Sequence, residues 1–174
     1  MIKGKRITLK PLREEDVPLY ASMLADPDMM GEYITARMAS ETAVKKRFSE
    51  TGLFDEDGGR LLIWVGERII GTVVYFKEPP YYNGYEMGYL LWDRESRRQG
   101  YTTEAVLTLA DYLFKIRPIN RLQLVITVGN EASMRVAQKA GFTLEGIARG
   151  AIFINGRNQD VQIFSLLRSE WTPQ

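Results

Sequence analysis

The segment Arg-Arg-Gln-Gly-Tyr-Thr-Thr-Glu-Ala, residues 97–105, has the residue types and spacing to hold a phosphate group. It lies where a strand-like pattern over residues 85–92 gives way to a helical one. The first amides of a helix lack intrahelical partners and carry partial positive charge, so a helix that begins here favours a bound anion. Gly100 lets the backbone approach a ligand closely, and Arg97 and Arg98 add charge suited to phosphate oxygens. On these residues alone, a phosphate cradle and a capped helix with solvated arginines are equally good interpretations.

The composition narrows the possible chemistry, because the 174 residues include no histidine and no cysteine. Serine–histidine and cysteine–histidine mechanisms are excluded, as is a cysteinyl acyl-enzyme, and no metal is expected. An enzyme built from this chain must use carboxylates, hydroxyls, lysine, arginine, backbone dipoles or a bound cosubstrate. A net charge of +1 predicts no general attraction to nucleic acid or membrane. The N-terminus does not resemble a signal peptide, so we expect a cytoplasmic protein.

Hydrophobic periodicity predicts a single mixed α/β domain over residues 1–174, in which part of the sheet is parallel. The helix over 102–116 has the clearest pattern, with apolar residues at every helical turn. We expect seven strands, over 6–12, 61–65, 69–76, 85–92, 122–128, 142–154 and 160–167, and four helices, over 13–25, 40–52, 102–116 and 131–140.

A second motif follows the loop: Asn130-Glu-Ala-Ser133, closed by Ala140-Gly141-Phe142. Together, the loop and this motif resemble the GNAT superfamily of acetyl-CoA-dependent N-acyltransferases. The Asn-x-x-Ser helix, the opening residues 7–16 and the segment Ile154-Asn-Gly-Arg157 more narrowly resemble its RimJ/RimL-like group, the ribosomal-protein N-terminal acetyltransferases and their relatives. The resemblance implies a GNAT-like fold, a central, mostly antiparallel twisted sheet of about seven strands flanked by about four helices.

The same resemblance implies how coenzyme A binds. Backbone amides of residues 98–103 would hold its pyrophosphate, and Asn130 and Ser133 would lie beside its pantetheine arm. The strand over 87–92 would splay from the strand over 122–128, which leaves backbone groups free to pair with the ligand. Thr102 departs from the glycine or alanine usual in the family's loop. The expected cofactor-binding residues are Tyr89, Leu90, Leu91, Trp92, Arg97, Arg98, Gln99, Gly100, Tyr101, Thr102, Thr103, Asn130 and Ser133.

Two residues are candidates for the catalytic steps of acetyl transfer. Glu86 alternates along its strand with Gly88, Leu90 and Trp92, and a carboxylate on such an apolar face suits a general base. Many members of the family carry an acid tyrosine at the position that Ala137 occupies here. We therefore expect Ser133 to act near the sulfur, as an acid or as a cofactor contact.

The acceptor is the least constrained element of the hypothesis. We expect Tyr81, Tyr82, Tyr85 and Asp160 to contact it, and we favour a protein or peptide α-amine, because a lysine amine is harder to deprotonate. A small-molecule amine remains an alternative, as does a non-catalytic acetyl-CoA sensor. A nucleotide- or nucleic-acid-binding domain is the weakest rival. The resembled group often forms dimers, so a homodimer is also expected.

Overall fold

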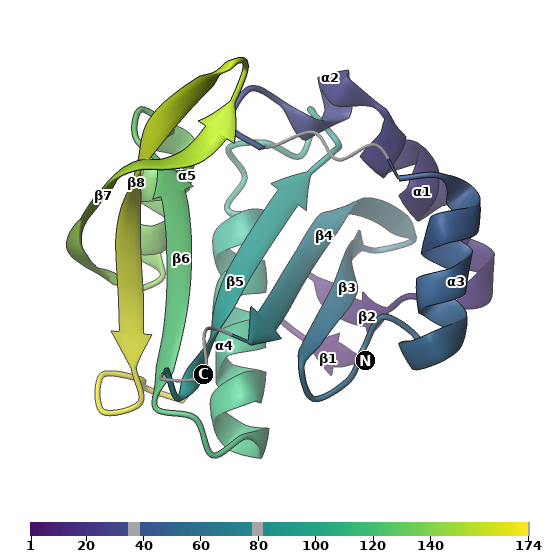
Figure 1. The fold of residues 1–174 in the computed structure, drawn as a ribbon. Helices are drawn as coiled ribbons and strands as arrows, with labels where there is room; N and C mark the ends of the chain where they lie inside the picture. Colours follow the sequence, from purple (N-terminus) through teal and green to yellow (C-terminus); the bar gives the residue numbers. More distant parts are fainter. Residues whose placement is uncertain (35–38, 78–81, 174) are drawn as a thin grey trace.

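The computed structural model describes residues 1–34, 39–77 and 82–173, which form one eight-stranded sheet with helices on both faces (Figure 1). The strands are β1 (Ile2–Lys3), β2 (Thr8–Pro11), β3 (Gly58–Val65), β4 (Arg68–Lys77), β5 (Gly84–Leu91), β6 (Arg121–Thr127), β7 (Thr143–Ile154) and β8 (Arg157–Leu167). The helices are the 3-10 turn η1 (Glu14–Asp16) and the α-helices α1 (Val17–Ala25), α2 (Pro27–Met30), α3 (Glu41–Thr51), α4 (Tyr101–Ile116) and α5 (Glu131–Lys139).

The sheet has the strand order β1-β2-β3-β4-β5-β6-β8-β7. All neighbouring strands are antiparallel except β5 and β6, which are parallel. A parallel pair needs a crossover, and here it is made by α4, whose apolar stripe packs across the sheet.

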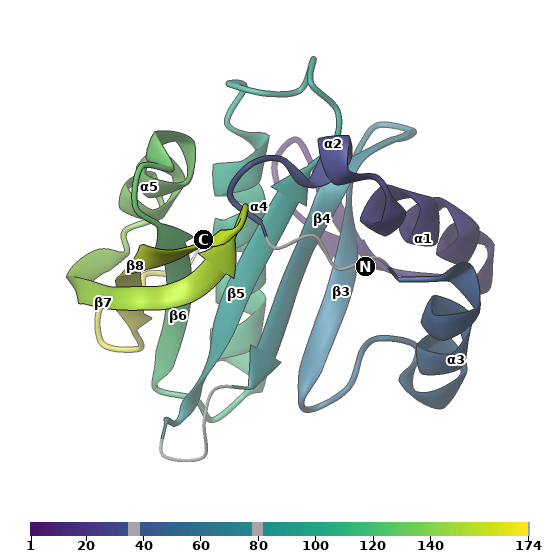
Figure 2. The ribbon, with the colours of Figure 1, turned by 45° about the horizontal axis from the view of Figure 1, so that its top comes forward.

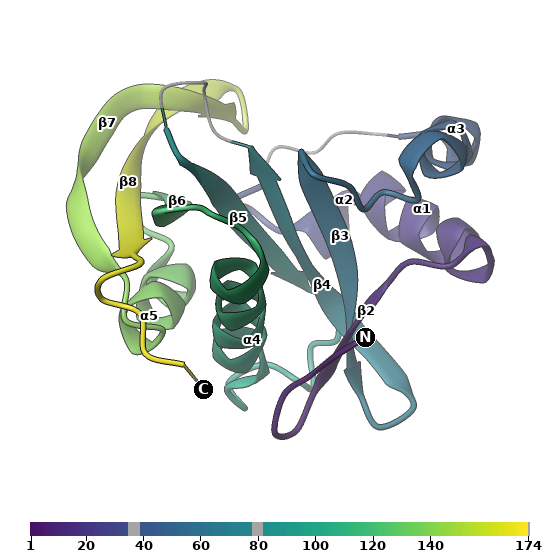
Figure 3. The same ribbon diagram turned by 90° about the horizontal axis from the view of Figure 1, so that it is seen from below.

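The two faces of the sheet have different covers, as Figure 3 shows. Helices α4 and α5 lie on one face, over the larger core, which includes Leu109, Leu113 and Phe114 of α4. Helices α1 and α3 lie on the other face, over a smaller apolar cluster around Tyr20 and Trp92. Strands β7 and β8 form a long hairpin at the far edge of the sheet (Figure 2).

Local sequence explains where the helices begin and end. The Ser40 hydroxyl accepts a hydrogen bond from the Ala43 amide and so caps α3, and Gly52, in the left-handed conformation at φ 64°, ends it. Asp26 caps α2 in the same way, with Pro27 in the first helical position. At α5 the Asn130 side chain accepts from the Ser133 amide.

The expected fold class is confirmed, including the parallel part of the sheet. The differences are small elements. β1 adds an eighth strand, and α2 occupies part of a segment expected to be irregular. The strand expected over 61–65 begins earlier, at Gly58, which brings Arg60 into β3. No helix within the described residues combines the length and apolar character needed to cross a membrane.

Candidate active site

The parallel strands β5 and β6 pair along only part of their length. Their register runs from Gly84 opposite Arg121 to Met87 opposite Leu124 and goes no further. Beyond that point β5 remains paired with β4, and β6 with β8. The two strands therefore diverge towards their carboxyl ends, as expected from the resemblance, and the backbone of Gly88 to Leu91 faces an opening.

Two helices begin at the open end of this splay. β5 leads into α4 through the loop over residues 92–100, and β6 leads through Gly129 and Asn130 into α5. The first backbone hydrogen bond at the start of α4 is from the Glu104 amide to the Gly100 carbonyl, 3.0 Å long. The preceding amides of the first turn therefore point out of the helix with no carbonyl below them, the arrangement that favours an anion at a helix terminus.

The loop before α4 is held in shape by the N-terminal segment. Arg6 donates to the Gln99 carbonyl at 3.0 Å and pairs with Glu104 at 3.0 Å. Arg98 and Gly100 both have positive φ, 63° and 83°, so the backbone turns sharply twice within three residues. Burial raises the pKa of Glu104, but hydrogen bonds from the Arg6 amide and guanidinium outweigh it and hold that pKa below its ordinary value.

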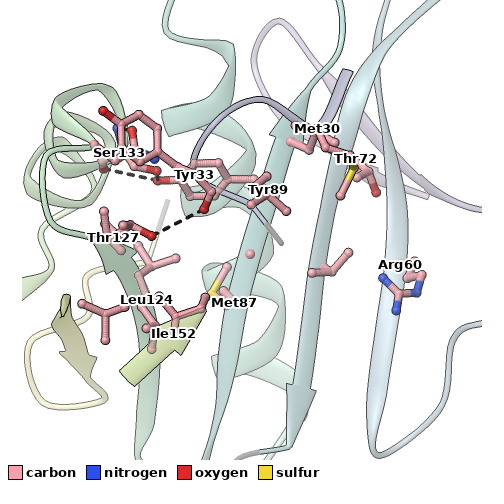
Figure 4. Close-up of a pocket in the computed structure, with 18 of the residues that line it drawn as sticks. Met30, Tyr33, Arg60, Thr72, Met87, Tyr89, Leu124, Thr127, Ser133 and Ile152 are labelled. Atoms are coloured by element: carbon pink, nitrogen blue, oxygen red, sulfur yellow. Dashed lines mark hydrogen bonds between the residues drawn. The ribbon is translucent and has the colours of Figure 1, made fainter. Parts of the chain in front are cut away.

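Tyr89 crosses the splay and meets α5. Its hydroxyl lies 2.8 Å from the Ser133 hydroxyl and donates to the Ser133 carbonyl at 3.2 Å (Figure 4). Burial raises the pKa of Tyr89 to about 12, although the hydrogen bond with Ser133 opposes the rise. The phenol is therefore protonated at neutral pH and is able to donate.

A cavity of about 300 Å³ passes through the splay. We call it the inner cavity. Its wall includes residues that face α4 and α5, such as Met87, Tyr89 and Leu124, and residues on the opposite face of the sheet, such as Val74 and Val125. Residues from both faces of the sheet thus line the inner cavity at the opening between β5 and β6.

A wider depression of about 730 Å³, the outer cavity, adjoins the inner cavity on the α1 and α3 face. Both are lined by Met30, Arg60 and Ile152. Figure 4 shows Arg60 on β3, on the side of the inner cavity away from Tyr33, Tyr89 and Ser133.

The structure brings together only part of the predicted site. Tyr89, Leu90, Asn130 and Ser133 all line the inner cavity. Glu86 is half-buried on the face of the sheet that α1 and α3 cover, and it lies opposite Gln123 in the β5–β6 register. It lines neither the inner nor the outer cavity. Its role as a base stays a prediction.

The expected acceptor contacts are scattered. Tyr85 is 4% exposed in the core on the opposite face, and its hydroxyl donates to the Glu56 carbonyl. Tyr82 lies under the Arg121 guanidinium, 5.3 Å from the ring centre. The Asp160 carboxylate accepts from the Gly150 amide at 2.8 Å within the β7–β8 hairpin. Tyr81 lies outside the described residues.

Sequence patterns did not single out Tyr33, Arg60 or Thr127, which also line the inner cavity. The sequence does contain an indication for Arg60, because it alternates with Leu62 and Trp64 and so shares their face of β3. It was missed because the strand was expected to begin at residue 61. Tyr33 and Thr127 meet only through tertiary contact: the Thr127 hydroxyl donates to the Tyr33 carbonyl at 3.4 Å. Among the described residues, no three carboxylates cluster in a way that suits a metal ion.

A mostly antiparallel sheet that opens at its parallel pair, with a helix terminus at the opening, is the architecture that the resemblance to the N-acyltransferases led us to expect. The comparison with known families agrees. The family described as the acetyltransferase (GNAT) domain matches residues 6–143. The chain therefore belongs to the GNAT acetyltransferase family and is an N-acetyltransferase.

Individual relatives support this assignment. The chain is 31% identical to a probable N-acetyltransferase, YjcK, of Bacillus subtilis (strain 168), with 98% of each chain covered. Two solved structures share the fold with TM-scores of 0.84 at 21% identity. One is a spermidine N-acetyltransferase from Vibrio cholerae in complex with CoA and spermine, covering 96% of this chain and 98% of that one. The other is RimL, a ribosomal L7/L12 alpha-N-protein acetyltransferase in complex with coenzyme A, covering 97% of both chains.

Proposed function

We propose that this protein transfers the acetyl group of acetyl-CoA to a primary amine by direct attack within a ternary complex. The observation that carries the proposal is the inner cavity, which lies at the β5–β6 splay and is lined by residues from both faces of the sheet. A cosubstrate on one face and an acceptor on the other would meet there without a covalent enzyme intermediate.

The cosubstrate would bind along the splay. Its pyrophosphate would lie on the amides of residues 98–103 at the start of α4, where the helix terminus supplies unpaired donors. Its pantetheine arm would run between β5 and β6 and pair with the backbone of Gly88 to Leu91 as an added strand does. Both solved relatives described above are in complex with coenzyme A, which supports coenzyme A as the carrier of the acetyl group.

Acetyl transfer needs an oxyanion donor and a proton for the departing sulfur. The amine nitrogen attacks the thioester carbonyl, a C–N bond forms and the C–S bond breaks. A backbone N–H on the splayed part of β5 would stabilise the oxyanion. The hydroxyl pair of Tyr89 and Ser133 would donate a proton to the coenzyme A thiolate. The amine's proton would pass to solvent, or through water to Glu86, which lies outside the cavity wall.

We favour an α-amine as the acceptor, either of a protein or peptide N-terminus or of a small molecule. An α-amine has a pKa near 7.7–8.0, against about 10.4 for lysine. Among the described residues, the inner cavity is lined by no carboxylate that would deprotonate a strongly basic amine. An amine that is already partly neutral needs less help from the protein.

Ligand-dependent melting tests the proposed function. A ligand at 100 times its Kd adds about 2.7 kcal/mol of stability, so acetyl-CoA is expected to raise Tm by roughly 5–10 °C, with ATP as the control. Release of free coenzyme A with a panel of α-amines then tests transfer. Binding without transfer to any amine would favour an acetyl-CoA sensor, and an equal shift with ATP would overturn the assignment of the loop.

Two further expectations belong to the proposal. A cytoplasmic location would give the enzyme access to acetyl-CoA. A homodimer would use the exposed apolar side chains along the edge strand β7, which are Leu144, Ile147 and Phe153.

A further inference from the structure

We infer that Arg60 binds a carboxylate on the acceptor, so that the preferred substrates are α-amines that carry an acidic group within a few bonds of the reacting nitrogen. This inference rests on the proposed acetyl transfer and specifies its acceptor. Its basis is the charge and position of Arg60 in the inner cavity.

Arg60 is level, across the strands of the sheet, with the point where β5 and β6 separate. It is opposite Val74 in the β3–β4 register, and Val74 is opposite Gly88 in the β4–β5 register. Gly88 is the first residue of β5 beyond its pairing with β6. Neighbouring strands are about 4.8 Å apart, so the Arg60 and Gly88 backbones are separated by roughly 10 Å, and the arginine side chain extends into the space above them.

The inner cavity has a single formal charge in its described wall. Its lining includes tyrosines, hydroxyls, an amide and apolar side chains, but Arg60 is the one ionised group among them. The guanidinium donates to the Tyr20 hydroxyl at 3.1 Å, and this phenol is a neutral partner because burial raises its pKa. No ion pair between Arg60 and a carboxylate occurs within the described parts of the chain.

The outer cavity does contain acidic residues, but their carboxylates have other partners. Asp55 accepts from the amides of Asp57 and Gly58, at 2.7 and 3.0 Å, and so shapes the turn before β3. Asp57 forms an ion pair with Lys77. Arg47 also lines this cavity. An acidic acceptor that reaches Arg60 through the outer cavity therefore passes both carboxylates and cationic side chains, and no net negative charge in the described lining repels it.

Tyr20 holds the guanidinium in place for recognition. The Arg60 guanidinium carbon lies 6.0 Å from the centre of the Tyr20 ring, in addition to the hydrogen bond with its hydroxyl. Within the described ranges, the other donors of this guanidinium have no hydrogen-bond partner, and a guanidinium already oriented in this way suits bidentate binding of a carboxylate.

A polyamine fits this cavity poorly. Each extra ammonium group would approach Arg60 without a described carboxylate in the inner wall to compensate it. An acidic acceptor gains an ion pair at the same place. The inference thus separates this protein's acceptor class from the spermidine acetylated by one of its structural relatives.

Matched acceptors test the inference in the wild-type enzyme. We would measure kcat/KM for the C-terminally amidated tripeptides Ala-Asp-Ala, Ala-Asn-Ala and Ala-Lys-Ala, for free alanine against alaninamide, and for spermidine. A charge-assisted hydrogen bond leads us to expect kcat/KM about 10- to 100-fold higher for the aspartyl peptide than for its asparaginyl isostere. The alanine pair shows whether an α-carboxylate serves instead of a side-chain carboxylate.

The variants R60Q and R60K identify the group responsible. R60Q should reduce the Asp-over-Asn preference in kcat/KM to within about threefold. R60K should retain part of the preference, because lysine keeps the positive charge but cannot make the bidentate hydrogen bonds of a guanidinium. R13Q is the matched control, since the Arg13 side chain is 75% exposed and lies outside both cavities. The Kd of acetyl-CoA, read by thermal shift, should be the same in all four proteins.

The outcomes separate the inference from the proposed function. If amines are acetylated but Asp and Asn peptides react equally in the wild type, or R60Q keeps the preference, the inference is wrong while the proposed function stands. If acetyl-CoA binds and none of the amines reacts, the proposed function itself fails. If R60Q changes the Kd of acetyl-CoA, R60K decides the question. An Asp-over-Asn preference in R60K between those of the wild type and R60Q would still support a role for the positive charge, and its absence would count against that role.

Discussion

The contact between Tyr89 and Ser133 changes the role expected for the Ser133 hydroxyl. Ser133 was expected near the sulfur because the family's acid tyrosine is replaced by Ala137, which is fully buried in the core. The structure places a different tyrosine beside Ser133. Tyr89 reaches from β5 to within 2.8 Å of the Ser133 hydroxyl. Under the proposed function, this phenol from β5 would act as the acid in place of the family's tyrosine.

Replacement of Tyr89 by phenylalanine is therefore expected to lower kcat by about 100-fold, the lower end of the typical contribution of general acid–base catalysis, because the Ser133 hydroxyl is still present. The Kd of acetyl-CoA should change little, because the ring still fills the same space beside α5. S133A should have a smaller effect on kcat, since Tyr89 keeps its bond to the Ser133 carbonyl.

Pre-steady-state measurement of free thiol release separates this step from product release. Y112F serves as the control, because Tyr112 packs against the core from α4 and lines neither cavity. An unchanged kcat in Y89F would remove the tyrosine from the proton transfer.

At the scale of elements, the phosphate loop depends on a segment almost a hundred residues away in sequence. Arg6 binds the Gln99 carbonyl and the Glu104 carboxylate and stacks 4.9 Å from the centre of the Tyr101 ring. These contacts fix the carbonyl of the loop and the first turn of α4 together, so the amides between them are already oriented before a ligand arrives.

Replacement of Arg6 by alanine should therefore weaken acetyl-CoA binding by about 5- to 10-fold, because the loop would then have to be ordered during binding. Isothermal titration with acetyl-CoA measures this, and R13A controls for loss of a surface arginine. The Michaelis constant of the acceptor should be unaffected. Equal affinities in R6A and the wild type would show that the loop keeps its shape without Arg6.

Much of the element order followed from local pattern, and the parts that did not have physical reasons. The helix over 101–116 is evident from its apolar stripe, and Ser40 and Gly52 mark α3 at both ends. The expected elements leave residues 26–39 without a helix, whereas in the structure Asp26 caps the short helix α2, which Pro27 begins. β1 is two residues long, too short for periodicity to detect.

The site was less predictable than the fold because it depends on register. The splay arises where the β5–β6 pairing stops, and no local pattern records which strand lies beside which. Arg60 joins the cavity only because β3, β4 and β5 align it with Val74 and Gly88. The family resemblance supplied the splay and the loop, but it did not supply this arginine.

At the scale of the whole molecule, the sheet must stay closed at one end of the β5–β6 pair in order to open at the other. Arg121 begins β6 at the closed end, opposite Gly84 of β5. Its guanidinium makes two contacts with the Glu145 carboxylate of β7, at 2.6 and 2.7 Å, and a third with Gln123. The Ser165 hydroxyl of β8 donates to the same carboxylate at 2.7 Å, so three strands are joined through Glu145.

This network should make stability depend on pH in a defined window. The hydrogen bond from Arg121, aided by that from Ser165, lowers the pKa of Glu145 from 4.5 to about 2. A depressed pKa contributes stability that is complete above the unfolded value, near 4.5, and is lost as the pH falls towards 2. Since the Glu145 side chain is 41% exposed, solvent screening reduces the expected contribution to about 1 kcal/mol.

Urea unfolding of the wild type and E145Q at a series of pH values between 7 and 2.5 measures that contribution. The free energy of unfolding of E145Q should be lower by about 1 kcal/mol at pH 7. The difference should shrink below pH 4.5, because the Glu145 carboxylate of the unfolded wild-type chain then takes up a proton while the native carboxylate stays ionised until the pH nears 2. E50Q, which removes an exposed carboxylate of α3, should follow the wild type throughout. A difference that stays constant down to pH 2.5 would mean that Glu145 stabilises the closed end through packing rather than charge. The opening between β5 and β6 would then be limited by the apolar contacts of the strands instead of by this ion pair.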